Sequence, residues 1–151
     1  MNLILWRHAE AENTSPDMDR GLTAKGKNQA LRMAAWLKPQ LPENTSILVS
    51  PAARAQQTAK ALNLPFTTLD VLAPGATAEQ VLLAANWPDN QNTVVIVGHQ
   101  PTLGVAAALA LSGKTQYWSV KKGAIWWISS RVRDAGQQTV LRAVMSPDLL
   151  E

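Results

Sequence analysis

Leu3-Ile4-Leu5-Trp6-Arg7-His8 is the stretch that decides the fold. Its first four residues form an unbroken apolar run, which indicates a buried strand, and the run ends abruptly in an arginine and a histidine. The chain has two histidines, and His99 ends a second run of the same design, Val94-Val95-Ile96-Val97-Gly98. A short β-branched run of this kind is typical of a strand buried on both faces of a parallel sheet. The sequence therefore predicts two central strands, each of which carries a histidine at its carboxyl end.

The composition is that of a folded globular protein. The chain has 151 residues, of which 46% are hydrophobic and 17% charged, and this length predicts one domain over residues 1–151. The longest apolar run, residues 105–111, is shorter than the ~20 residues of a membrane helix. The N-terminus lacks a basic segment ahead of an apolar one, as a secretory signal would have. We therefore expect a cytoplasmic protein without a membrane segment. The lack of cysteine excludes disulfides, thiolate metal sites and thiol nucleophiles.

Charge is unevenly distributed, although the formal net charge is only +3. Residues 10–19 hold four acids and no base, whereas residues 114–142 hold six bases and one acid. The six bases are Lys114, Lys121, Lys122, Arg131, Arg133 and Arg142. This basic third could steer an anionic substrate or an acidic partner, although a solvated surface is the simpler interpretation. We expect no nucleic-acid partner, because the bases are not interleaved with aromatic residues.

Helical patterns follow the first strand after a polar loop over residues 10–21. Thr23 is a suitable N-cap for a helix that Pro39 ends. Gly26 lowers helix propensity in the first turn, which indicates a close approach by another part of the chain. The predicted apolar face consists of Ala30, Leu31, Ala34 and Leu37.

A second strand and helix carry a further arginine. Residues 47–49 form a short apolar run, and Ser50-Pro51 is expected to cap and begin a helix that runs to about Leu62. Arg54 lies in the first turn of that helix. The remaining predicted elements are a short strand over 66–69, a helix from a capping box at 77–80 to about residue 86, a helix from Pro101 to about residues 112–113, and two strands over 124–129 and 140–145 joined across residues 134–136.

Strands that alternate with helices predict an α/β fold, a three-layer sandwich with a mostly parallel central sheet and helices on both faces. In such a sheet the carboxyl ends of the strands lie at one edge, where ligands bind. Three predicted strand ends meet there: Arg7-His8, Ser50 with the following Arg54, and Gly98-His99. We expect these residues to form one site.

Two arginines and two histidines at one point are suited to a phosphoryl group. Arginine donates two parallel hydrogen bonds to such an anion, and backbone amides at helix starts add more. A neutral imidazole can attack phosphorus and form a phosphohistidine that water later cleaves, so this chemistry needs no metal and no cofactor. A metal site would need a third ligand, which Glu10 or Glu12 could supply, but two histidines without an HxH or HExxH spacing make it the less favoured interpretation.

At this point the residues resemble a known family. Arg7-His8-Ala9 is similar to the Arg-His-Gly signature of the histidine phosphatase superfamily, which includes the phosphoglycerate mutases. The stretch from Ser50 to Ala59 resembles its second arginine motif, and Val97-Gly98-His99-Gln100-Pro101 resembles its second histidine motif. The short length, residues 20–26 and residues 145–147 are most similar to SixA-type phosphohistidine phosphatases.

The resemblance implies a role for each residue of the predicted site. His8 would be the nucleophile, with Arg7, Arg54 and His99 holding the phosphoryl group, and Arg20 would lie near the pocket. Ala9 departs from the family's glycine, and we expect the extra methyl group to be tolerated. The sequence also lacks the inserted segment that carries a catalytic acid in larger members. Between residues 71 and 93 the acids are Glu79 and Asp89, and the helix dipole explains Glu79 as a first-turn residue.

The missing acid predicts the substrate. An alkoxide leaving group loses about 10² to 10⁴ in rate without a general acid, whereas an imidazole, whose conjugate acid has a pKa near ~6.5, hardly needs that help. We therefore expect a phosphatase that acts on phosphohistidine in a protein partner. We also expect the protein to be a monomer. One alternative is a phosphatase of small phosphate esters or metabolites, with Glu10, Glu12 or Asp17 as the acid. Another is a non-catalytic phosphate-binding module.

Overall fold

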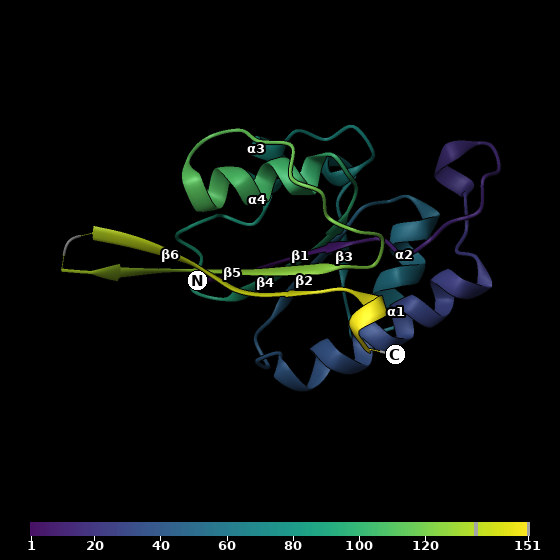
Figure 1. Cartoon of the computed structure of the whole chain (residues 1–151), viewed down its shortest axis with the longest axis horizontal. Coiled ribbons are helices and arrows are strands. Elements are labelled where there is room, and N and C mark those ends of the chain that lie inside the picture. The colour runs from purple at the N-terminus through teal and green to yellow at the C-terminus, as the bar shows by residue number, and fades with distance from the viewer. Residues whose placement is uncertain (135, 151) are drawn as a thin grey trace.

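A six-stranded sheet forms the centre of the molecule (Figure 1), for which a computed structural model describes residues 1–134 and 136–150. The strands are β1 (Asn2–Arg7), β2 (Ser46–Val49), β3 (Thr67–Thr68), β4 (Thr93–Gly98), β5 (Ile125–Arg133) and β6 (Gly136–Met145). Their order across the sheet is β3-β2-β4-β1-β5-β6. The first strand of the chain therefore lies inside the sheet, between β4 and β5.

Most of the sheet is parallel. β4 pairs in parallel with both β1 and β2, and β2 pairs in parallel with β3. β5 runs antiparallel to β1 and to β6. In the register of β1 and β4, Arg7 lies opposite Gly98, so the two predicted histidine-bearing strands end side by side.

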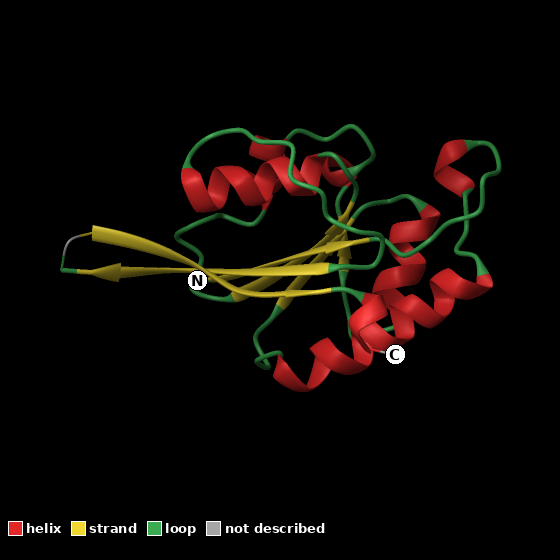
Figure 2. Ribbon diagram, viewed as in Figure 1, coloured by secondary structure: helices red, strands yellow, loops and turns green. Residues whose placement is uncertain are grey.

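Helices cover both faces of the sheet (Figure 2). The α-helices are α1 (Ala24–Leu37), α2 (Ala53–Lys60), α3 (Ala78–Ala84) and α4 (Thr102–Ser112), and the short 3-10 turns are η1 (Asp17–Asp19), η2 (Lys38–Gln40), η3 (Asp70–Leu72) and η4 (Pro147–Leu150). Helices α3 and α4 lie on one face and α1 and α2 on the other. The predicted three-layer α/β sandwich is confirmed. Within the described residues, no helix combines the length and the apolar character needed to cross a membrane.

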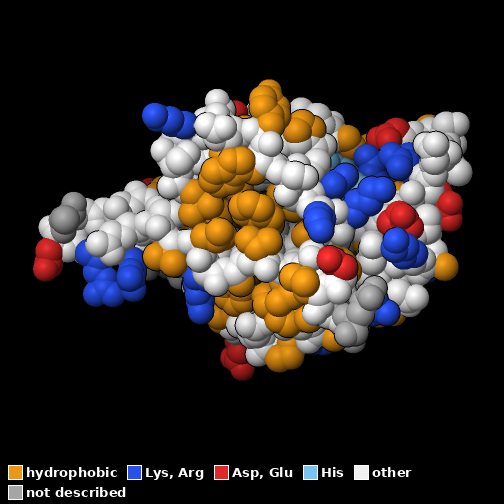
Figure 3. Space-filling model, in the orientation of Figure 1, with side chains coloured by type: hydrophobic (Ala, Val, Ile, Leu, Met, Phe, Trp, Pro, Cys, Tyr) orange, Lys and Arg blue, Asp and Glu red, His pale blue; other side chains and the backbone are white. Residues whose placement is uncertain are grey.

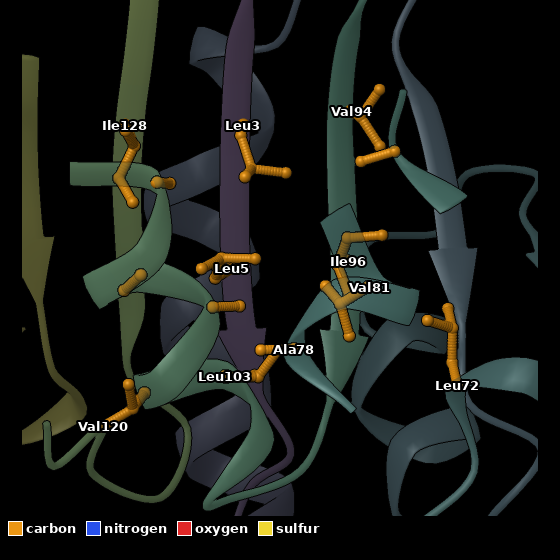
Figure 4. Packing of buried hydrophobic residues seen from close by; sticks show 14 of the residues in the cluster. Leu3, Leu5, Leu72, Ala78, Val81, Val94, Ile96, Leu103, Val120 and Ile128 are labelled. Carbon is orange, nitrogen blue, oxygen red and sulfur yellow. The ribbon is translucent and has the colours of Figure 1, made fainter. Parts of the chain in front are cut away.

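The core is divided by the sheet into two layers. Leu3 and Leu5 of β1 pack with Ile96 of β4 under α3 and α4, as Figure 4 shows. Ile4 and Trp6, which alternate with them, pack on the opposite side with α1 and α2. β1 is therefore buried on both faces, which fixes its position and that of the residues that follow it.

Helix α1 begins as predicted, but its buried face differs from the prediction. The Thr23 hydroxyl accepts a hydrogen bond from the Gly26 N–H at 2.9 Å. A Cβ on Gly26 would lie 2.0 Å from the Glu10 carbonyl oxygen, which confirms the predicted close approach. The prediction for Leu31 is wrong: its side chain is 57% exposed, and Met33 is buried instead.

The start of α2 also differs from the prediction. The helix begins at Ala53, with Ala52 as its N-cap, and Ser50-Pro51 lies in the connection between β2 and the helix. Ser50 is therefore not the cap, and its hydroxyl forms a hydrogen bond with His99. The predicted capping box at Thr77 and Gln80 is present at the start of α3.

The antiparallel end of the sheet is longer than predicted. β5 continues after residue 129 and β6 begins before residue 140. The added residues form a two-stranded arm, in which Arg133 pairs with Gly136. Of the predicted turn at residues 134–136, Ala135 lies outside the described residues.

Candidate active site

The ends of three neighbouring strands meet at one edge of the sheet. Beyond the strands, the His8 N–H donates to the Gly98 carbonyl and the Ser50 N–H donates to the Val97 carbonyl, each at 3.0 Å. The parallel pairing thus continues by one residue past the end of each strand. The rings of His8 and His99 lie with their centroids 5.2 Å apart and are both buried.

His8 is held in one orientation by its own backbone. Its Nδ1 donates to the carbonyl oxygen of Ala9 at 2.8 Å, and because a carbonyl can only accept, Nδ1 carries the proton. Burial, together with the positive charges of Arg54, Arg7 and Arg20, lowers the pKa of His8 to about 4. The ring is therefore neutral at pH 7, and its Nε2 holds a free lone pair.

His99 is fixed by the residue that follows β2. Its Nε2 shares a hydrogen bond of 2.7 Å with the Ser50 hydroxyl, which also accepts from the Ala52 N–H at 3.2 Å. Burial first, and then the neighbouring His8 and Arg54, lower the pKa of His99 to about 3. The Nδ1 of His99 is buried without a partner among the described residues.

Arg54 and Arg20 share one carboxylate. Arg54 is 4% exposed, and it donates to the Asp17 backbone oxygen at 2.8 Å and to Asp17 Oδ2 at 3.2 Å. Arg20 donates to Asp17 Oδ1 at 3.2 Å and to the Glu12 carbonyl at 2.7 Å. Hydrogen bonds from Arg20 and Arg54 lower the pKa of Asp17, so this acid is ionised at neutral pH.

Arg7 completes the positive cluster from the β1 side. One of its terminal nitrogens donates to the Val120 carbonyl at 2.9 Å, and burial lowers its pKa. The Nε atoms of Arg7 and Arg54 are buried without partners among the described residues. Buried donors in this state are costly, and an anion is the partner that would satisfy two arginines at once.

Two hydroxyl residues position the site: Thr58, for which the sequence predicted no role, and Ser50, which the sequence placed at this edge but with a different role. The Thr58 hydroxyl donates to the Arg54 carbonyl at 2.8 Å and accepts from the Ala9 N–H at 3.0 Å, and thereby ties α2 to the end of β1. Its position one helical turn after Arg54, on the same face, was the available signal. The sequence predicts Ser50 as a helix cap, and no sequence signal distinguishes a cap hydroxyl from one that holds a histidine.

The remaining groups that the sequence singled out are Glu10, Glu12 and Ala9. The Glu10 carboxylate accepts from the Thr23 hydroxyl at 2.8 Å, and Glu12 is exposed. Among the described residues, no group of three or more His, Asp or Glu side chains is arranged to hold a metal ion. Ala9 is buried, and the non-glycine residues described with positive φ are Asn63 and Asn86, so the turn after His8 does not require glycine.

Comparison with known proteins identifies the family. The histidine phosphatase superfamily (branch 1) matches residues 3–73. The phosphohistidine phosphatase SixA of Escherichia coli is 33% identical over 125 residues, which cover 76% of this chain and 77% of SixA. A solved structure of the protein histidine phosphatase SixA complexed with tungstate is 29% identical, covers 100% of both chains and superposes with a TM-score of 0.82.

The fold alone is shared more widely. The phosphoserine phosphatase of Entamoeba histolytica, solved as a mutant with phosphoserine, is 19% identical and has a TM-score of 0.72, with 99% of each chain covered. The substrate therefore does not follow from the architecture. The identity and coverage shared with SixA nevertheless establish that this chain belongs to the histidine phosphatase superfamily and is SixA-like within it.

Proposed function

We propose that this protein removes the phosphoryl group from phosphohistidine on a protein, through a covalent phosphohistidine intermediate on His8. The observation that carries the proposal is the state of His8: a buried, neutral ring whose Nδ1 is bonded to the Ala9 carbonyl and whose Nε2 is available. SixA itself is a phosphohistidine phosphatase, and its structure with tungstate, a tetrahedral oxyanion, supports an oxyanion site in this fold.

In the first step Nε2 of His8 attacks phosphorus, and the bond from phosphorus to the nitrogen of the substrate histidine breaks. The substrate ring, which carries a proton on its other nitrogen, keeps the electron pair of the broken bond and leaves as a neutral imidazole. In the second step water attacks the phosphorus on His8, which releases inorganic phosphate and restores the neutral ring. Arg7, Arg54 and His99 stabilise the charge on the transferred oxygens in both steps.

The acids near the site support an imidazole leaving group. Asp17 is bonded to two arginines that keep it ionised, so it is a poor proton donor. Glu10 is bonded to the hydroxyl that caps α1. An ester phosphatase would need one of these acids to protonate an alkoxide, whereas an imidazole leaves without such help.

The decisive experiment is to trap the intermediate. After brief incubation with phosphoramidate and an acid-free quench, we expect an acid-labile phosphoryl group on His8 by mass spectrometry. The His8→Ala variant should lose both the label and turnover, with a fall in kcat of about 10³-fold or more. Full turnover by His8→Ala would refute covalent catalysis, and binding of phosphate without any turnover in the unmodified protein would identify a phosphate-binding module instead.

A substrate panel tests the leaving group. We expect a phosphohistidine peptide to be hydrolysed with a kcat/KM at least about 10²-fold above that of a sugar phosphate. Comparable values would favour the ester phosphatase, and substitutions of Glu10, Glu12 and Asp17 would then identify its acid. The cytoplasmic location, the monomeric state and the single domain over residues 1–151 stay predictions.

A further inference from the structure

A large basic cavity adjoins the site on the Arg7 side. It has a volume of about 610 Å³ and lies between α1 and the segment that leads into β5. Its charged lining consists of Arg7, Lys25, Arg32, Lys121, Lys122 and Asp148. Five of these six side chains are basic, so the described lining has a clear excess of positive charge. Figure 3 shows Lys and Arg side chains gathered at this end of the sheet, with acidic side chains interspersed among them.

Both walls of the cavity are anchored to the end of β1. On the side of α1, the Gln29 side-chain oxygen accepts from the Glu10 N–H at 2.9 Å. On the other side, the Gly123 N–H donates to the His8 carbonyl at 3.0 Å, and the Val120 carbonyl accepts from Arg7. The segment that carries Lys121 and Lys122 is therefore tied to the end of β1, and the cavity shares Arg7 with the phosphoryl site.

The chemistry of the lining favours carboxylates over a second phosphoryl group. The lining holds two arginines, Arg7 and Arg32, but most of its basic side chains are lysines. Lys25, Lys121 and Lys122 are exposed point charges on flexible stems, which lack the fixed directions of arginine forks and backbone amides. The cavity is also much larger than one phosphoryl group requires. Several acidic side chains on a protein surface would fill it and meet the lysines without a fixed geometry.

We propose that this cavity binds acidic side chains that flank the phosphohistidine on the protein substrate. The inference rests on the proposed function, because it names the kind of phosphohistidine protein that the site selects. Arg7 joins the two regions: it lines the cavity and lies next to His8, so an acidic segment in the cavity places the adjacent phosphohistidine at Nε2. Asp148, whose carboxylate is bonded to the Ser146 hydroxyl, opposes part of this charge.

Two synthetic peptides test the cavity. Both carry one phosphohistidine, flanked by glutamates in one and by glutamines in the other. We expect the unmodified protein to prefer the glutamate peptide by about tenfold in kcat/KM at low salt, and the preference to shrink as salt screens the charges. The double variant Lys121→Gln/Lys122→Gln should lose most of this preference. Lys114→Gln, a matched change of an exposed lysine at the far end of α4, should retain it in full.

The outcomes separate the two proposals. If the double variant and the unmodified protein preferred the glutamate peptide to the same extent, the cavity assignment would be overturned. Hydrolysis of both peptides would still uphold the proposed function. Failure of the unmodified protein to hydrolyse either peptide would overturn the proposed function and this inference with it. A third outcome concerns a second phosphoryl group. If the double variant lost turnover of a sugar bisphosphate relative to the monophosphate, while its peptide preference was unchanged, the cavity would be assigned to a second phosphoryl group. That result would overturn the inference.

Discussion

The low pKa of His8 distinguishes it from an ordinary surface histidine. Its usual value of 6.5 falls to about 4 because burial and three arginines disfavour the imidazolium. A proton on Nε2 takes up the lone pair that attacks phosphorus. We therefore expect activity to decline only as the pH falls through about 4. We expect an NMR titration of the His8 ring, with His99→Gln as the assignment control, and the acid limb of kcat/KM to agree. A transition near 6.5 would show that the ring is solvated.

Asp17 occupies the hydrogen-bonding groups of Arg54 and Arg20 that a phosphoryl group would use. A substrate must therefore displace this carboxylate or share the arginines with it. We expect Asp17→Asn to lower the inhibition constant of inorganic phosphate by about threefold to tenfold, because the competing charge is removed. Asp19→Asn, on the same 3-10 turn, is the control. A large fall in kcat for esters in Asp17→Asn would instead identify Asp17 as an acid catalyst.

At the scale of the element, Gly26 decides how α1 meets the end of β1. Helix propensity alone predicts that Gly26→Ala stabilises the protein by about 1 kcal/mol. The Glu10 carbonyl, 2.0 Å from where the new Cβ would lie, is backbone and cannot rotate away. We therefore expect Gly26→Ala to lower the free energy of unfolding by about 1–3 kcal/mol in urea titrations. Ala35→Gly, on the exposed side of the same helix, measures the propensity term alone, and a stabilised Gly26→Ala variant would refute the contact.

The elements that could be predicted are those with strong local signals. The apolar runs that end at Arg7 and at Gly98 and the capping residues Thr23 and Thr77 mark where strands and helices lie, and the structure confirms them. The extended β5 and β6 arm escaped prediction because its outer residues pair through backbone hydrogen bonds and lack an alternating apolar pattern.

The candidate site was predictable in part. Its arginines and histidines follow apolar runs, and this position in the sequence is visible without a structure. The contacts that fix them are not. The Ser50 hydroxyl meets His99 because β2 and β4 end side by side, and Thr58 joins Arg54 to Ala9 because α2 lies against the end of β1. Such pairings depend on tertiary geometry, and hydroxyl residues have many local uses that mask them.

For the whole molecule, the buried histidine pair links stability to pH. The folded pKa values of about 4 for His8 and about 3 for His99 lie below the unfolded value of 6.5. Below pH 6.5 the unfolded chain therefore binds more protons, and stability declines until the pH reaches the folded values. We expect the free energy of unfolding to fall by a few kcal/mol between about pH 6.5 and 4. The His8→Asn variant should show a shallower fall, and an unchanged slope would contradict the linkage.

The position of β1 in the sheet has a consequence for synthesis on the ribosome. β1 is made long before its two neighbours, β4 and β5, which come from residues beyond 92. Until those residues emerge, the apolar strand that carries His8 has no partner in the native sheet. Pairing over such a separation in sequence is slow and exposes apolar surface. The nascent chain must therefore keep β1 from aggregating until β4 and β5 have been made, and His8 can meet His99 only after β4 has been made.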